Sequence, residues 1–240
     1  MKMKPNKYII ATAVASAITA TAQAAVVFQV DIHMTGGTSQ ELQSGWTAWD
    51  VDKVTTNNSI STTLSGIGVS ITSNGGGYVT ARGGTTEDRD GEITGTSWDD
   101  VVEDFAVARA GNGSATLSLT GLDNTKTYSL TIYNNDCYEI SGNPGFAGGT
   151  LTPTITTGAI VGVADAGTIT NVREGARTDG DFDNQFISFT PDSGGNADIL
   201  ITSSSNFVLF SGMQLDVVPE PSSAALLGLG GLALIFRRRK

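Results

Sequence analysis

Three aspartates alternate along a short glycine-containing stretch in the last third of the chain. Asp179, Asp181 and Asp183 occupy every second position in the sequence DGDFDN. Calcium takes six to eight oxygen ligands, and closely spaced carboxylates supply several of them from a single loop. The spacing therefore predicts a loop that binds Ca²⁺, the one cofactor that the sequence suggests. A solvated acidic turn is the alternative.

The beginning of this stretch resembles an EF-hand loop. Asn184, however, stands where that motif has glycine, and Thr190 stands where it has the closing glutamate. The stretch is therefore expected to act as a generic calcium loop rather than as an EF-hand. A second acidic stretch, residues 87–92, is a weaker candidate because Arg89 already supplies a countercharge.

Aromatic residues beside polar ones are the candidates for stacking on sugar rings. Tyr133 ends a run of alternating residues and is expected to project from the sheet surface. Tyr138 follows Asp136 in a long polar loop, and loops of that length are often functional. These three residues and Trp46 are the predicted ligand contacts, although an early tryptophan in a β-sandwich is more often a core residue.

Catalytic signatures are missing from the sequence. His33 is the only histidine and Cys137 the only cysteine, which excludes multi-histidine metal sites and internal disulfides and argues against His-dependent triads. No nucleophile-elbow, phosphate-loop or dinucleotide motif is present. The acidic cluster at 99–104 is interpreted as the solvated face of a short helix. We therefore expect a protein that is not an enzyme.

Charge is distributed unevenly along the chain. Seven of the fourteen basic residues lie in the two end segments, whereas 23 of the 24 acidic residues lie between them, so the middle carries a formal charge of −16. Such a surface repels nucleic acid and anionic lipid, and neither is expected as a partner of the middle domain.

The N-terminal segment, residues 1–24, has the three parts of a secretory signal peptide. Lys2, Lys4 and Lys7 precede an uncharged, alanine-rich run, and Ala22-Gln23-Ala24 offers small residues for signal peptidase. The run is shorter than the ~20 residues of a membrane span, so cleavage before Ala25 is expected.

The C-terminal segment, residues 218–240, reads VPEPSSAALLGLGGLALIFRRRK. Its apolar run is short for a permanent transmembrane helix, and the closing basic cluster is typical of a stop-transfer element; transient membrane insertion is therefore expected. The segment closely resembles the PEP-CTERM sorting signal. The resemblance implies processing by an exosortase, passage through the inner membrane, and a final place at the cell surface or in the exopolysaccharide matrix of a biofilm. It assigns recognition to Pro219, Glu220 and Pro221, and stop-transfer to Arg237, Arg238, Arg239 and Lys240.

Residues 25–217 form the expected working domain. Short period-two runs separated by Gly, Ser, Thr, Asn and Asp predict an all-β fold, an antiparallel β-sandwich or jelly roll, flanked by a signal helix and a short C-terminal hydrophobic helix. The clearest pair is predicted as a hairpin: 116–120 and 128–133, joined by Gly121–Thr127. Only Trp98, Val101, Val102 and Phe105 have helical spacing.

The order of segments also resembles galactose-binding-like and malectin-like jelly rolls. The residues that carry this resemblance are QSGW at 43–46, LTGL at 119–122 leading into YSLTI at 128–132, and FSGMQL at 210–215. It implies carbohydrate binding by analogy. The leading hypothesis is a non-catalytic surface or matrix protein that binds polysaccharide. A structural matrix protein or adhesin with protein partners is the alternative, and a small glycan-active hydrolase is the third.

Overall fold

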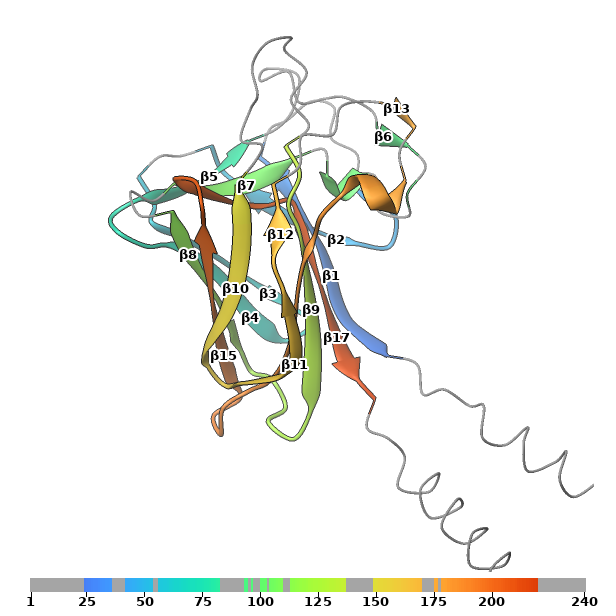
Figure 1. Ribbon diagram of the computed structural model, residues 1–240, viewed down its shortest axis with the longest axis vertical. Helices are drawn as coiled ribbons and strands as arrows, with labels where there is room; N and C mark the ends of the chain where they lie inside the picture. The colour runs from blue at the N-terminus through green and yellow to red at the C-terminus, as the bar shows by residue number, and fades with distance from the viewer. Residues whose placement is uncertain are drawn as a thin grey trace, which may run out of the picture. The chain divides into compact units, whose positions relative to one another are not determined.

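The computed structural model describes residues 24–35, 42–53, 56–82, 93–94, 96, 100–102, 104–109, 113–136, 149–169, 175–176 and 178–219. Within these ranges the chain is all-β, with two short 3-10 turns and no α-helix (Figure 1). Among these residues no helix is long and apolar enough to cross a membrane. The signal helix and the C-terminal helix expected from the sequence fall at 1–23 and 220–240, outside the described residues.

The first six-stranded sheet, called sheet A, has the order β11-β14-β9-β17-β1-β2. Its strands are β1 (Ala25–Met34), β2 (Thr47–Val51), β9 (Thr127–Tyr133), β11 (Ala159–Asp165), β14 (Gln185–Thr190) and β17 (Gly212–Val218). β1 and β2 run parallel, whereas β14 pairs antiparallel with both β9 and β11, so the sheet is mixed. The last strand of the chain therefore lies inside sheet A, between the first strand and β9.

The second six-stranded sheet, sheet B, has the order β12-β10-β15-β8-β4-β3. Its strands are β3 (Ser59–Leu64), β4 (Ile67–Ser73), β8 (Ser114–Thr120), β10 (Thr150–Thr157), β12 (Gly167–Thr168) and β15 (Asn196–Ser203). All of its strand pairs are antiparallel. Sheet B thus has the architecture that alternating short strands predict.

Two smaller sheets and two 3-10 turns complete the described structure. A three-stranded sheet has the order β16-β7-β5, and a two-stranded parallel sheet joins β13 to β6. Their strands are β5 (Tyr78–Arg82), β6 (Ile93–Thr94), β7 (Phe105–Arg109), β13 (Gly175–Ala176) and β16 (Phe207–Phe210), and the 3-10 turns are η2 (Asp100–Val102) and η3 (Asp179–Asp181).

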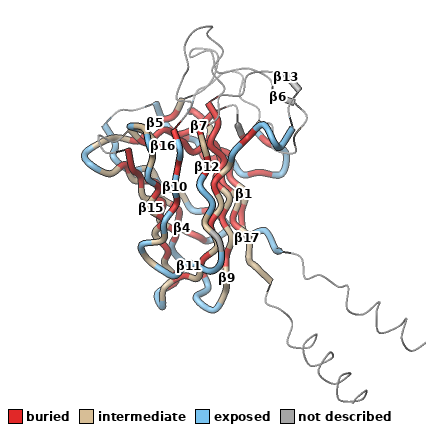
Figure 2. Tube along the Cα trace, in the orientation of Figure 1, coloured by how far each residue is buried: buried red, intermediate tan, exposed pale blue. Residues whose placement is uncertain are grey.

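One hydrophobic core takes residues from both large sheets. Leu117 and Leu119 of sheet B and Leu130 and Ile132 of sheet A are fully buried within it. β8 and β9 contribute alternate residues, because successive side chains of a strand point to opposite faces. Residues Val26–Val217 form one compact unit, and Figure 2 shows buried positions running along the strands of both sheets. Two sheets around one core are compatible with the predicted sandwich.

The predicted hairpin is wrong in its pairing. β8 pairs with β4 and β15 in sheet B, whereas β9 pairs with β14 in sheet A. The connection at 121–126 therefore crosses from one sheet to the other, and the two apolar faces meet across the core instead of lying side by side. Alternation determines which face of a strand is buried, but it does not select the strand's partner.

The predicted short helix is reduced to the single 3-10 turn η2. Phe105 begins strand β7 directly after it, and both Val101 and Phe105 are fully buried. Trp98 lies outside the described residues. Val101 and Phe105 are thus buried, one from a turn and the other from a strand.

Candidate functional site

Strand β1 carries two ionisable residues on the face that points away from the core. Val30, Ile32 and Met34 belong to the core cluster, so Asp31 and His33 lie on the opposite face of the strand. That face would be solvated in a simple two-layer sandwich. Asp31 is nevertheless completely buried, and the side chain of His33 is only 12% exposed. Another part of the chain must therefore cover this side of sheet A.

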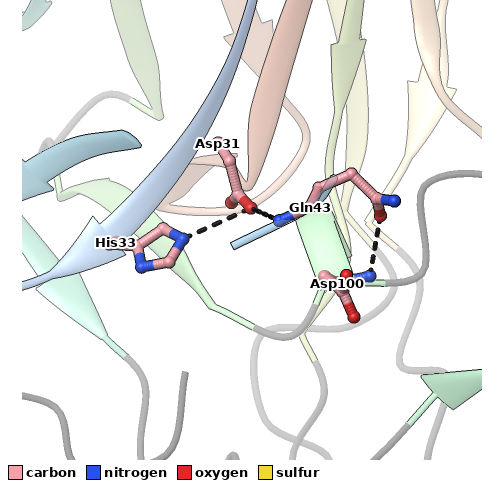
Figure 3. A network of polar contacts seen from close by, with 4 residues as sticks. All are labelled: Asp31, His33, Gln43 and Asp100. Atoms are coloured by element: carbon pink, nitrogen blue, oxygen red, sulfur yellow. Dashed lines mark hydrogen bonds and ion pairs between the residues drawn. The ribbon is translucent and has the colours of Figure 1, made fainter. Parts of the chain in front are cut away.

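Two covering segments provide that cover: residues 42–46, and residues 100–102 together with Asp104. The backbone N–H of Gln43 donates to Asp31 Oδ2 at 3.0 Å. The side-chain Oε1 of Gln43 in turn accepts from the backbone N–H of Asp100 at 3.0 Å. Figure 3 shows this chain of contacts from β1 through Gln43 to η2. One glutamine thus ties both covering segments to Asp31.

A glycine in β17 lets the covering segments approach the sheet closely. A Cβ atom at Gly212 would meet a methyl group of Val101, the carbonyl oxygen of Val30 at 2.7 Å and the ring of Trp46 at 3.3 Å. Trp46 also meets Tyr133 of β9 edge to face, with ring centroids 5.4 Å apart and an interplanar angle of 70°. The cover therefore extends from β1 across β17 to β9.

Asp31, His33 and Asp104 form the Asp–His cluster beneath this cover. Each offers one ligand atom, and the three atoms lie within 4.8 Å of one another. His33 Nε2 is 3.3 Å from Asp31 Oδ2, an ion pair if the ring is protonated. Asp104 is 1% exposed. In the part of the chain that the structure describes, this is the one group of three such donors close enough to share a metal ion.

The carboxylates around His33 decide its protonation. Burial is the largest single influence and by itself would lower the pKa of His33. The contact with Asp31 and the negative charges of Asp104, Asp31 and Asp50 together outweigh it, so the pKa of His33 is raised above its ordinary value. Asp50 lies directly beside His33 on the parallel strand β2. The site therefore favours positive charge, either as a proton on the imidazole or as a bound cation.

Asp31 has one oxygen that the protein leaves unused. Its Oδ2 accepts the hydrogen bond from Gln43, while Oδ1, although buried, accepts none from the residues that the structure describes. Buried polar atoms are almost always hydrogen-bonded, because an unsatisfied one costs about 1–3 kcal/mol. The arrangement is therefore suited to a ligand that the described residues do not supply.

The structure removes two of the predicted aromatic contacts from the surface. Tyr133 was expected to project into solvent, but it is 6% exposed, because Trp46 and the covering segments lie over that face. Burial, with the nearby charges of Asp216 and Asp179, raises the pKa of Tyr133 to about 12. Trp46 is likewise buried, as the alternative interpretation held, and Asp136 is fully buried. Tyr138 and Cys137 lie outside the described residues.

Among the alternating aspartates at 179–183, Asp181 uses its carboxylate and Asp183 its backbone oxygen in local hydrogen bonds. Asp181 Oδ2 accepts from both the backbone N–H and the hydroxyl of Thr178, at 2.8 and 3.1 Å, and so caps η3. Asp183 accepts through its backbone oxygen from Thr168 and from the side chain of Asn134. Asp179, Asp181 and Asp183 are not among the groups of described residues whose ligand atoms converge. The calcium loop stays a prediction, and the second acidic stretch lies outside the described residues.

A groove opens where both large sheets end in an edge strand, between β2 and β3. It has a volume of about 280 Å³. Its lining combines acids, an amide and hydroxyls with three apolar side chains, and comprises Trp49, Asp50, Val51, Asp52, Asn57, Ser59, Ile60 and Ser61. Sequence analysis did not single out this groove, because the two strands belong to different sheets.

Sequence analysis also missed the Asp–His cluster. His33 was interpreted as an isolated histidine, and Asp104 as part of the solvated face of a helix. One signal was present in the sequence: Asp31 and His33 are the two ionisable residues of the mostly apolar strand AVVFQVDIHM. Their partner Asp104 is distant in sequence, and no local pattern connects it to them.

The comparison with known protein families bears on the end of the chain. Residues 217–240 match the model of the PEP-CTERM protein-sorting motif. No curated protein is similar enough to the chain to be matched. The match confirms the predicted sorting signal and indicates an exported protein that an exosortase processes. Pro219 directly follows β17 and is the last described residue; Glu220, Pro221 and Arg237, Arg238, Arg239 and Lys240 lie outside the described residues.

Proposed function

We propose that this protein is a non-catalytic surface or matrix protein, whose β domain, residues 25–217, is displayed at the cell surface after an exosortase removes the C-terminal segment. The observation that carries this proposal is the sorting motif at 217–240, immediately after the last strand of sheet A. Proline cannot donate to a strand ladder, so Pro219 is suited to end β17 at Val218. The folded domain and the processing signal are then adjacent without overlapping.

Within this proposal, the burial of Trp46 and Tyr133 favours a structural or adhesive role over a sugar-stacking surface on β9. Aromatic rings stack on sugars only where their faces are accessible, and these two rings contact each other instead. A matrix component that meets other proteins needs no such platform. For this face of the domain, we therefore favour a structural or adhesive role over sugar binding.

Replacement of Pro219, Glu220 and Pro221 by alanine tests the sorting step. We expect an uncleaved precursor to accumulate in the inner membrane, detected by fractionation and immunoblotting. Conversion of Arg237, Arg238 and Arg239 to lysine is the matched control, because it retains the stop-transfer charge and should leave processing intact. Normal mature protein at the surface in the alanine variant would contradict the proposal.

Glycan binding has one specific observation in its favour, the groove between β2 and β3. Sugar hydroxyls bind carboxylate, amide and hydroxyl groups, and the apolar faces of sugar rings pack on apolar side chains. Asp52, Asn57 and Ile60 offer these chemistries in one groove. We therefore propose the groove, with a jelly-roll scaffold behind it, as the polysaccharide site.

A glycan array with the full chain in detergent tests this second candidate. We expect binding that falls at least tenfold in Asp52→Asn and in Asn57→Ala. Thr202→Ala, an exposed position on sheet B away from the groove, is the control and should bind normally. No binding to any glycan, or binding unaffected by both groove variants, would leave the structural role as the proposed function.

A further inference from the structure

We propose that Asp31, His33 and Asp104 bind one divalent transition-metal ion of the zinc type, buried beneath the covering segments. The site does not use the sorting signal, and none of its three proposed ligands is among the residues that line the groove.

The donor set selects the class of metal. One imidazole nitrogen with two carboxylate oxygens suits zinc and its neighbours in the first transition row. Calcium and magnesium prefer oxygen ligands alone, and calcium needs more of them than these three residues provide. The Asp–His cluster therefore differs in chemistry from the calcium loop predicted at 179–183.

The spacing of the donors fits a small coordination sphere. Ligands at about 2.0–2.2 Å from a tetrahedral zinc ion are about 3.3–3.5 Å apart. His33 Nε2 and Asp31 Oδ2 are 3.3 Å apart. The three ligand atoms all lie within 4.8 Å of one another, so closing the site needs a shift of at most about 1.5 Å in any one pair.

Neighbouring residues orient the Asp31 carboxylate, and one of its two oxygens stays available to bind a metal ion. The backbone N–H of Gln43 orients the Asp31 carboxylate, the kind of outer contact that supports metal ligands. Asp31 Oδ1 is buried and accepts no hydrogen bond from the described residues. This second observation distinguishes the cluster from a simple group of acids. The partial exposure of His33 gives the ion a route of entry.

Metal content and affinity test the proposal. The full chain in detergent is stripped with a chelator, titrated with Zn²⁺, and analysed by calorimetry and by elemental analysis after desalting. We expect one Zn²⁺ per chain, and a loss of affinity of at least tenfold in His33→Gln and in Asp104→Asn.

Asp50→Asn is the matched control. It removes a negative charge beside His33 without removing a proposed ligand, so the stoichiometry should stay at one. If Asp50→Asn abolishes binding as completely as His33→Gln, or if the unaltered chain retains no Zn²⁺, the proposal is overturned.

A spectroscopic measurement on the unaltered chain keeps the test valid should a variant fail to fold. Co²⁺ in place of Zn²⁺ should give the visible absorption of a four- or five-coordinate site with nitrogen and oxygen ligands. The ¹⁵N resonance of His33 Nε2 should shift on addition of Zn²⁺. An octahedral Co²⁺ spectrum like that of the free ion, together with an unshifted His33 resonance, would contradict the site.

Discussion

Two carboxylates, Asp31 and Asp192, both accept hydrogen bonds from backbone N–H groups, but one is buried and the other lies in an exposed turn. Asp192 lies in the turn between β14 and β15, where its Oδ1 accepts from the backbone N–H groups of Gly194 and Asn196 at 2.9 and 2.8 Å. Asp31 accepts one backbone hydrogen bond, from Gln43, but it is completely buried. The bonds at Asp192 are more numerous, yet water can replace them. Burial, rather than the number of bonds, should therefore decide what each residue contributes to stability.

The regions around Asp192 and Asp31 also differ in how far apart in sequence their interacting residues are. Near Asp192, the turn at 121–126 is closed by Asp123, and the two turns are joined by the hydrogen bond from Leu122 N–H to Gly195 O. Each of these turns is specified by residues adjacent in sequence. The Asp–His cluster combines two residues of β1 with Asp104, the residue before β7. The comparison suggests that local turns stabilise this domain in small increments, whereas the buried cluster depends on long-range packing.

Asp31→Ala should have the largest effect on stability. The substitution leaves the Gln43 N–H unsatisfied and removes the closest countercharge of His33, so we expect a loss of about 3–5 kcal/mol. Chemical denaturation in the presence of chelator measures it. Asp31→Asn, which keeps an acceptor for Gln43, should lose less. Equal losses in the two variants would mean that charge alone matters at this position.

High pH should weaken the covered face of sheet A. The pKa of Tyr133 is raised to about 12 in the folded protein, whereas an unfolded tyrosine ionises near 10. The stability that results is present below pH ~10 and is lost as pH rises toward ~12, and it amounts to ~2.5 kcal/mol. The ultraviolet difference titration between the unaltered chain and Tyr133→Phe isolates this group. If Tyr133 ionises near pH 10, its side chain is exposed to solvent and the covering segments do not bury it.

Gly212→Ala tests the close approach of the covering segments. The new Cβ would overlap Val101 and the carbonyl of Val30, so we expect a loss of about 2 kcal/mol from overpacking. Gly180→Ala is the control, because its Cβ would meet nothing closer than Thr178 Oγ1 at 3.8 Å. Equal thermal melts for both variants would show that the segments do not press on β17.

Asp192→Ala should have the smallest effect. Its hydrogen bonds from Asn196 and Gly194 lower the pKa of Asp192. A lowered pKa stabilises the fold above the ordinary value near 4, and that contribution is lost as pH falls through the folded-state pKa. The difference in Tm between the unaltered chain and Asp192→Ala should therefore shrink below about pH 4. If Asp192→Ala loses as much stability as Asp31→Ala, burial does not decide what each carboxylate contributes.

The contrast between the regions also explains what sequence reasoning achieved. The alternation of Leu117 with Leu119, and of Leu130 with Ile132, correctly predicted buried faces, because it depends only on neighbouring residues. The partner of each strand was not predictable, since a turn that begins with glycine serves a hairpin and a crossing between sheets equally well. Tyr133 was misjudged for a related reason: nothing in its own strand shows that Trp46 lies over it.

The candidate site was less accessible to sequence reasoning than the fold. Polar residues at every second position, as at Gln29, Asp31 and His33, are typical of a strand face that is exposed to solvent. Asp31 is buried instead because Gln43 and Asp104, both distant in sequence, lie close to it. The sorting motif was identified completely because its recognition depends on contiguous residues. A signal made of contiguous residues can be identified from the sequence, whereas a site whose residues are brought together by packing cannot.

The place of β17 between β9 and β1 has a mechanical consequence. Because β17 has a hydrogen-bonded neighbour on each side, a force that pulls Val218 along the strand loads both ladders at once, in shear. Such a strand can be withdrawn only by breaking many bonds together, whereas a strand at a sheet edge has one ladder to lose.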